Sequence, residues 1–285
     1  MKLIATMPVR NEDWILGCSL RAVLRWCDEV VVLNHASTDN SAVIIGEVAR
    51  ENPFRVTLIE DAGEKWDEMP QRQRMLEAAR RNQATHIAIV DADEILTGNL
   101  LSQIRSDIAN LPPGYAIEVP GYNLRGSLTK YHQNGIWGNR WFSLAFADNK
   151  RVGWVGDQFH ARLPAGLTRT KPYQQNVGGV MHLWGTSERR LRAKHRLYRI
   201  TERLRWPSKP AAEIEEMYSW ATKGRPAAND TPERWRYNYT HQTWWAPYAD
   251  IMRHIHSDAE PWQEAECARL IALHGPKKFA GLDLS

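Results

Sequence analysis

Short apolar runs alternate with amphipathic stretches over the first 120 residues of the chain. The runs are rich in β-branched residues, as in 30–33, and predict strands at 2–7, 30–33, 55–60, 86–90 and 115–119. The stretches between them carry apolar residues at helical spacing and predict helices at 13–26, 41–50, 69–82 and 102–110. This alternation predicts an α/β fold with a doubly wound, mostly parallel sheet and helices on both of its faces.

The pattern changes after Pro120, where Gly, Asn, Trp and Tyr become frequent and β-like pieces such as 141–146 are short. We interpret 121–186 as an antiparallel or irregular extension of the sheet within the same domain. Helical spacing returns at Ser187 and predicts a helical C-terminal region. The predicted organisation is therefore 1–120, 121–186 and 187–285.

A basic helix is predicted over 187–206, with eight Lys or Arg against two acidic residues. Leu197, Ile200 and Leu204 form its apolar face, which leaves Arg192, Arg199 and Arg203 as the expected solvent-facing residues. Such a face suits an anionic partner, either a nucleic acid or an anionic glycolipid surface.

Composition narrows the class of protein. Charged residues make up 25% of the chain and hydrophobic residues 43%, which is typical of soluble globular proteins. No run of about 18 apolar residues predicts a membrane span, and the first apolar segment is too short for a signal peptide. Three cysteines without a CxxC pair predict reduced thiols in a cytoplasmic protein, with peripheral membrane contact left open by the net charge of +4.

Polar clusters follow three of the predicted strands, at 8–12, 34–39 and 91–94. Ligands of open α/β sheets bind outside the carboxyl ends of the strands, so these clusters are expected at one edge. Asp91 and Asp93 stand one residue apart just after a buried strand, and their oxygens are of the kind that Mg²⁺ or Mn²⁺ prefers. The sequence therefore predicts a divalent-metal site there.

Four segments resemble motifs of the family 2 glycosyltransferases, which have the nucleotide-sugar-binding GT-A fold. They are Pro8-Val9-Arg10-Asn11-Glu12, the stretch 31–41, Gln71-Arg72-Gln73-Arg74-Met75-Leu76 and Val90-Asp91-Ala92-Asp93-Glu94. Together they cover about residues 2–96 in the family's order. Weaker similarity continues at 140–142, 155–160 and 181–184.

The resemblance implies an enzyme, a metal-dependent and inverting transferase that moves a sugar from a nucleoside-diphosphate sugar to a hydroxyl of a glycan, glycolipid or other acceptor. It implies Mn²⁺ or Mg²⁺ as cofactor, held by Asp91, Asp93 and His182. It also implies donor-binding residues in the four motifs: Pro8, Arg10, Glu12, Asn34, His35, Asp39, Arg72, Arg74 and Asp91. The general base is expected beyond the metal motif at Asp157, with Glu188 as the second candidate.

The sequence departs from the family pattern at three places, the mildest of which is Gln73 where the family has Asn. Asn34 or His35 stands where the family has an acidic residue that pairs with the donor base, and Ala161 follows His160 where the family often has Glu. Three alternatives stay open: a sugar-phosphate nucleotidyltransferase, a transferase that glycosylates a modified DNA base, and a nucleic-acid-binding protein. The absence of Gly from 8–12 disfavours the first, and the absence of helix-turn-helix, zinc-finger or RNP signatures disfavours the last.

Overall fold

The computed structural model describes residues 1–63, 67–156, 162–175, 177–223 and 235–285, with 220–223 described by their backbone alone. These residues form two compact units. Unit 1 consists of Met1–Gly121, Arg140–His182 and His241–His256, and unit 2 of Tyr122–Asn139, Leu183–Thr240 and Ser257–Ser285. The chain thus crosses between the units several times, whereas the sequence regions were drawn as three consecutive segments.

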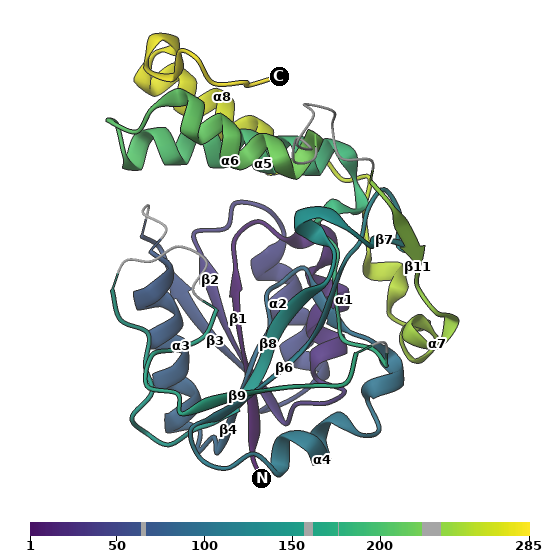
Figure 1. Ribbon diagram of the computed structural model, residues 1–285. Coiled ribbons are helices and arrows are strands. Elements are labelled where there is room, and N and C mark those ends of the chain that lie inside the picture. Colours follow the sequence, from purple (N-terminus) through teal and green to yellow (C-terminus); the bar gives the residue numbers. More distant parts are fainter. Residues whose placement is uncertain (64–66, 157–161, 176, 224–234) are drawn as a thin grey trace. The chain divides into compact units, whose positions relative to one another are not determined.

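Unit 1 contains a nine-stranded sheet among the described residues, with the path β3-β2-β1-β4-β8-β6-β10-β5 and β9 beside β6 (Figure 1). Its strands are β1 (Leu3–Val9), β2 (Glu29–His35), β3 (Val56–Asp61), β4 (His86–Ile89), β5 (Glu94–Leu96), β6 (Tyr115–Asn123), β8 (Arg140–Ala147), β9 (Arg169–Pro172) and β10 (Val180–His182). The last two residues of β6 belong to unit 2.

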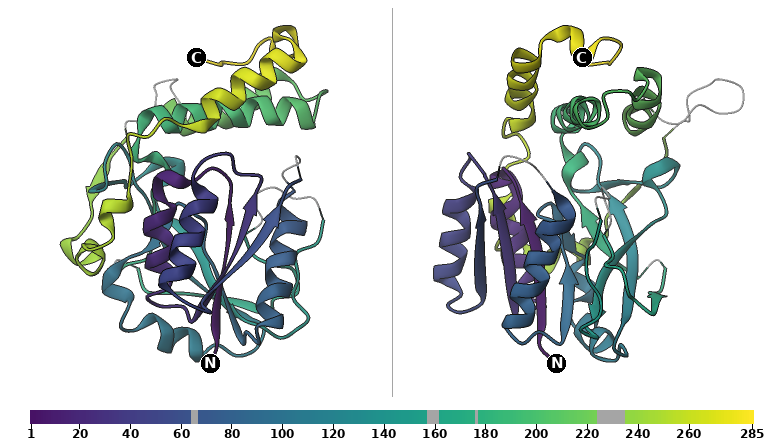
Figure 2. Two further views of the ribbon diagram at one scale, coloured as in Figure 1. Left: turned by 180° about the vertical axis from the view of Figure 1, so that it is seen from behind. Right: turned by 90° about the vertical axis from the view of Figure 1, so that its left-hand side faces the viewer.

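Alternate side chains of the central strands face two separate hydrophobic clusters. Val30 and Val32 of β2 pack in one cluster with helices α1 (Asp13–Val23), α2 (Ser41–Glu51) and α4 (Ile104–Ala109). Val31 and Leu33 of the same strand pack in the other cluster with α3 (Glu68–Arg81). Burial of each such side chain stabilises the fold by roughly 1.5–3 kcal/mol relative to leaving it exposed. Helices therefore cover both faces of the sheet, as predicted and as the two views of Figure 2 allow the reader to follow.

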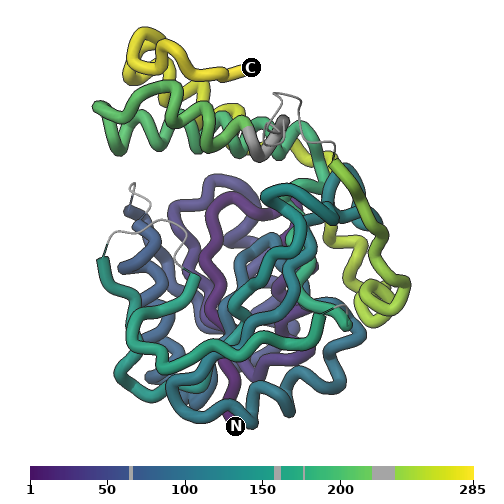
Figure 3. The backbone as a smooth tube through the Cα atoms, viewed as in Figure 1, coloured from purple at the N-terminus to yellow at the C-terminus, as the bar shows by residue number. Residues whose placement is uncertain are grey.

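The strands β1, β2, β3 and β4 pair in parallel, with β1 between β2 and β4 in the interior of unit 1 (Figure 3). The later strands add antiparallel pairs, β4 with β8, β6 with β8, and β5 with β10. The predicted fold class, a doubly wound and mostly parallel sheet with an antiparallel extension, is confirmed. A short helix, α7 (Gln242–Trp245), returns to unit 1 from late in the sequence.

Unit 2 contains the helices α5 (Glu188–Arg205), α6 (Ala211–Lys223) and α8 (Trp262–His274). It also contains a two-stranded antiparallel pair, β7 (Lys130–His132) with β11 (Tyr237–Tyr239). Ile200, Cys267 and Phe279 form a small core, against which Leu197 and Leu204 pack as expected.

The solvent exposure of the arginines on the basic helix differs from the prediction. Arg192 is exposed, but Arg199 is buried and its Nε donates to the Glu215 carboxylate of α6 at 3.0 Å. Arg203 is half-buried and donates to the carbonyl of Pro207. The predicted solvent-facing set is therefore wrong for Arg199, which pairs with a carboxylate of another helix in unit 2, and Arg203 is only partly exposed.

Cys18, Cys27 and Cys267 are buried free thiols. Among the described helices, none combines the length and the apolar character that a bilayer crossing requires.

Candidate active site

The predicted polar clusters meet at the carboxyl ends of β1, β2 and β4, because these strands are parallel neighbours in the sheet. Asn11 and Ala36 turn the chain just past β1 and β2 with φ of 54° and 44°. Such backbone conformations are costly for residues with a Cβ and are concentrated at functional sites.

Hydrogen bonds join the first two loops to each other. The Oδ1 of Asn11 accepts from the backbone N–H of Thr38 at 2.7 Å, and the N–H of Asn11 donates to the Ser37 hydroxyl at 3.0 Å. The predicted donor-binding residue Asp39 uses both carboxylate oxygens on backbone N–H groups, those of Asp13 at 3.0 Å and Ser41 at 2.9 Å. Its observed contacts brace the loops, a part that sequence reasoning did not assign.

The residues predicted near the donor base also lie at this edge. Asn34 is buried, and its Nδ2 donates to Oε2 of Glu60 at 2.9 Å. The Nη1 of Arg10 lies 3.2 Å from Nδ1 of the buried His35. Pro8 is half-buried at the end of β1, and Glu12 accepts from the indole N–H of Trp14 at 2.7 Å.

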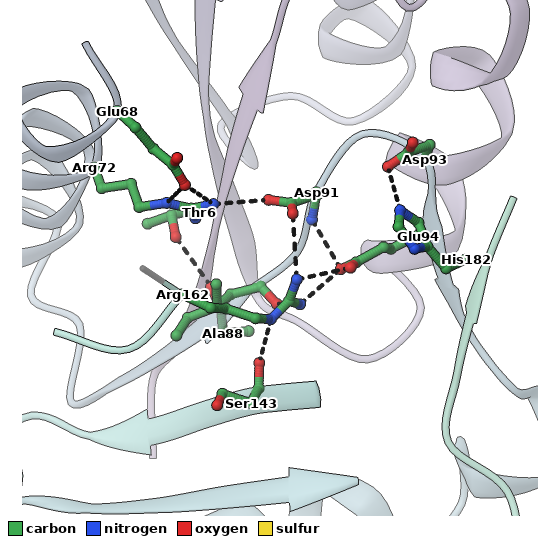
Figure 4. Close-up of polar contacts among 11 residues, drawn as sticks. Thr6, Glu68, Arg72, Ala88, Asp91, Asp93, Glu94, Ser143, Arg162 and His182 are labelled. Atoms are coloured by element: carbon green, nitrogen blue, oxygen red, sulfur yellow. Dashed lines mark hydrogen bonds and ion pairs between the residues drawn. The ribbon is translucent and has the colours of Figure 1, made fainter. Parts of the chain in front are cut away.

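The two predicted arginines of α3 have different surroundings. Arg72 is buried, donates to Glu68 at 2.9 Å and reaches Oδ1 of Asp91 at 3.2 Å through Nη2 (Figure 4). Its Nη1 is buried without a hydrogen-bond partner among the described residues. Arg74 is exposed, and its Nη1 contacts Asp61 at the end of β3 at 2.9 Å. The structure thus brings Arg72, but not Arg74, to the Asp91 turn.

Asp93 and His182 come together although 89 positions separate them (Figure 4). The short strand β5 follows Asp93 and pairs antiparallel with β10, with His182 opposite Glu94. This register leaves Oδ1 of Asp93 3.4 Å from Nε2 of His182. Asp93 is buried and His182 half-buried, and the rings of His182 and Phe142 meet in a T-shaped arrangement at a centroid distance of 5.6 Å. Two of the three predicted metal ligands therefore converge.

Asp91, the third predicted ligand, lies between two guanidinium groups. Its Oδ1 accepts from Arg72 and its Oδ2 from Nη1 of Arg162, both at 3.2 Å. Burial raises the pKa of the Asp91 carboxyl, but the two arginines outweigh burial and the pKa lies below its ordinary value. Asp91 is therefore a carboxylate at neutral pH, with an arginine on each oxygen.

Arg162 is the residue of this site that sequence reasoning missed. It stands directly after Ala161, in a stretch without periodicity that would have pointed to it. Its Nη1 and Nη2 donate to the two oxygens of Glu94 at 2.7 and 2.6 Å. Burial raises the pKa of Glu94 above its ordinary value, although Arg162 opposes the effect.

Only one of the two candidate bases, Glu188, falls within the residues that the structure describes. Asp157 and its neighbour His160 lie outside the described residues. Glu188 begins α5 in unit 2, where both of its oxygens accept from Arg125, at 2.6 and 2.9 Å.

A sequence profile of known proteins matches residues 5–163, more than half of the chain, and its description is Glycosyl transferase family 2. The chain belongs to glycosyl transferase family 2. It is therefore an enzyme that transfers a sugar, and the nucleotidyltransferase and nucleic-acid-binding alternatives give way to this class. The matched range covers all four motifs and extends past them to Arg162.

Several solved structures are similar to this family 2 enzyme. A mannosyltransferase from Pyrobaculum calidifontis, in complex with GDP-Man and Mn²⁺, is 15% identical with a TM-score of 0.46, over 98% of this chain and 84% of that one. TarS 1–349 of S. aureus is 14% identical with a TM-score of 0.45, over 79% and 71% of the two chains. Glucosyl-3-phosphoglycerate synthase of Mycobacterium tuberculosis is 14% identical with a TM-score of 0.32, over 42% and 43%. No curated protein matches the sequence.

Proposed function

We propose that this family 2 enzyme transfers a sugar from a nucleoside-diphosphate sugar to a hydroxyl acceptor, with inversion and with Mn²⁺ or Mg²⁺ as cofactor. The observation that carries the proposal is the convergence of Asp93 and His182 beside Asp91 at the carboxyl edge of the sheet. This is the edge at which open α/β sheets bind their ligands.

The residues at this edge fit a divalent metal bound together with its substrate. Among the described residues, no three His, Cys, Asp or Glu side chains gather as a complete metal cage. Asp93 and His182 supply one hard oxygen and one imidazole nitrogen, which suits an ion that takes its other ligands from water and substrate phosphates. When bound, the ion supplies positive charge where the leaving diphosphate becomes more negative.

The chain's own groups have separate tasks in this proposal. Asp91 orients the nucleotide by accepting from a ribose hydroxyl or from a metal-bound water, because its arginine partners keep it charged. The buried Nη1 of Arg72 offers an unused donor close to Asp91. Fixed donors of this kind stabilise a developing anion without reorganising.

The acceptor hydroxyl must lose a proton as it attacks the sugar, and we assign that proton to Asp157, with Glu188 as the second candidate. Glycans, glycolipids and modified bases in DNA all carry a suitable hydroxyl. Peripheral membrane contact in a cytoplasmic setting would serve a glycolipid acceptor.

The test is a panel of nucleoside-diphosphate sugars incubated with the enzyme, with release of the nucleoside diphosphate measured in Mn²⁺ and in EDTA. We expect release from at least one donor in Mn²⁺ and its loss in EDTA. Asp157→Asn should lower acceptor-dependent turnover about 10²-fold or more, the usual scale for a general base, without changing donor affinity. Full turnover in that variant would move the assignment to Glu188, and release that persists in EDTA would contradict metal dependence.

A further inference from the structure

Arg162 uses every hydrogen that its guanidinium can donate. Its Nε donates to the carbonyl of Ser143 at 2.8 Å (Figure 4). Its Nη2 donates to the carbonyl of Ile89 at 2.8 Å. The remaining three contacts reach the carboxylates of Asp91 and Glu94. Five donors thus meet five acceptors, the full complement of a guanidinium.

These contacts tie three parts of unit 1 together. Ile89 ends β4, Ser143 lies in β8, and the turn between Asp91 and Glu94 connects β4 to β5. The same turn closes on itself, since the N–H of Asp91 donates to Oε2 of Glu94 at 3.1 Å and the N–H of Glu94 donates to the Asp91 carbonyl at 3.0 Å. Asp93 lies inside this turn, so whatever fixes the turn also fixes Asp93.

Arg162 also reaches the other half of the proposed metal pair. Its Cζ lies 5.2 Å from the centroid of the Phe142 ring, and the same ring contacts His182 edge-on. The guanidinium therefore touches both the turn that carries Asp93 and the ring that supports His182.

Without arginine partners, the carboxylates of Glu94 and Asp91 would compete with Asp93 for a cation. Four carboxylates, Glu68, Asp91, Asp93 and Glu94, lie around the turn, and all but Asp91 are buried. Arg162 spans both oxygens of Glu94 and one of Asp91, while Arg72 takes the other oxygen of Asp91.

We propose that Arg162 is a positioning residue that holds Asp91 and Glu94 in its guanidinium fork and so leaves the metal ion of the donor complex to Asp93 and His182. The inference rests on the proposed function, because it concerns the ligands of that metal. It assigns to Arg162 a part in metal binding through other residues and not through direct contact.

Arg162→Lys is the decisive variant, because lysine keeps the charge but replaces a planar fork of five donors by three donors on one atom. Its effect on the Mn²⁺ dissociation constant is measured from the electron paramagnetic resonance of free Mn²⁺, with UDP or GDP present. Loss of an outer-shell partner typically costs 10–100-fold in metal affinity, and we expect a loss of that size. Because lysine keeps the positive charge, a lost charge cannot account for such a loss.

Arg80→Lys is the matched control. Arg80 also lies in unit 1 and binds both oxygens of a buried carboxylate, that of Asp148 at 2.9 and 2.8 Å, and a carbonyl, that of Val152. It stands near the end of α3, away from the carboxyl ends of the strands. We expect a loss of thermal stability in this variant with Mn²⁺ affinity close to that of the unmodified enzyme.

Equal Mn²⁺ affinity in the unmodified enzyme and Arg162→Lys would overturn the inference while leaving the proposed function intact. Equal losses in Arg162→Lys and Arg80→Lys would overturn it as well, because they would reflect general destabilisation. If Arg162→Lys does not fold, Glu94→Gln weakens the same fork, and unchanged affinity there overturns the inference. An unmodified enzyme that binds neither Mn²⁺ nor either nucleotide would overturn the proposed function itself, and the inference with it.

Discussion

At the scale of single residues, opposite charges lie close together and largely shielded from solvent at the carboxyl ends of the strands of unit 1. Asp91 stays ionised because Arg72 and Arg162 outweigh the cost of its burial. Buried charges without such partners would be neutralised or would destabilise the fold. The sequence predicted Asp91, Asp93 and Arg72 from motifs, but nothing local to Arg162 could reveal it, because its partners stand about 70 positions earlier in the chain.

Asn34 gives a prediction at this scale. Its Nδ2 donates to Glu60, so Asn34→Asp would place a second carboxylate against the first and alter the hydrogen-bonding groups of the proposed base pocket. We expect a changed ranking of UDP against GDP in competitive binding. Asn82→Asp is the control, because Asn82 donates to Glu29 at 3.1 Å in the same way but stands at the end of α3. An unchanged ranking in Asn34→Asp would place the base pocket elsewhere.

At the scale of elements, apolar periodicity predicted the central strands and the helices between them, but not the three-residue strands. The core strands and α5 lie where the pattern placed them, because each buries a continuous face. β5 and β10 contain three residues each, too few for a period to be visible, although their pairing brings His182 to Asp93. The pattern likewise could not show that Arg199 is buried, since its partner Glu215 belongs to another helix.

His195 of α5 gives the prediction at this scale. It is buried among aromatic rings, and burial, with Arg199 and Lys194 adding to it, lowers its pKa to about 3. The unfolded chain binds a proton at His195 near pH 6.5 and the folded chain does not. The contribution of His195 to the free energy of unfolding is therefore fully present above pH 6.5. It is lost as the pH falls toward 3, by up to about 1.4 kcal/mol per pH unit.

The measurement is the urea midpoint of unfolding at pH 7 and pH 5. His195→Gln cannot take up the proton, so we expect a smaller decrease between the two pH values than in the unmodified enzyme. His274→Gln, which changes an exposed histidine of α8, should keep the full decrease. A full decrease in His195→Gln would contradict the assignment of this pH dependence to His195.

At the scale of the whole molecule, each compact unit is built from segments that are far apart in the sequence. The segment His241–His256 rejoins unit 1, where Tyr248 is buried and its hydroxyl donates to the Leu96 carbonyl at 2.8 Å. Asp250 pairs with Arg25 at 2.6 Å in the same unit. The local hydrophobic pattern assigned this segment to a helical C-terminal region. Such a pattern carries no information about contacts with residues 150 or more positions away.

The proposed donor site, at which Asp93 holds the metal, is tested most directly by the calorimetric affinity for UDP and GDP with Mn²⁺ and with EDTA. We expect Mn²⁺ to strengthen binding of at least one nucleotide to the unmodified enzyme. Asp93→Asn should bind that nucleotide equally weakly in both conditions while remaining folded, and Asp250→Asn, at an exposed ion pair, should respond as the unmodified enzyme does. A full Mn²⁺ response in folded Asp93→Asn would contradict the claim.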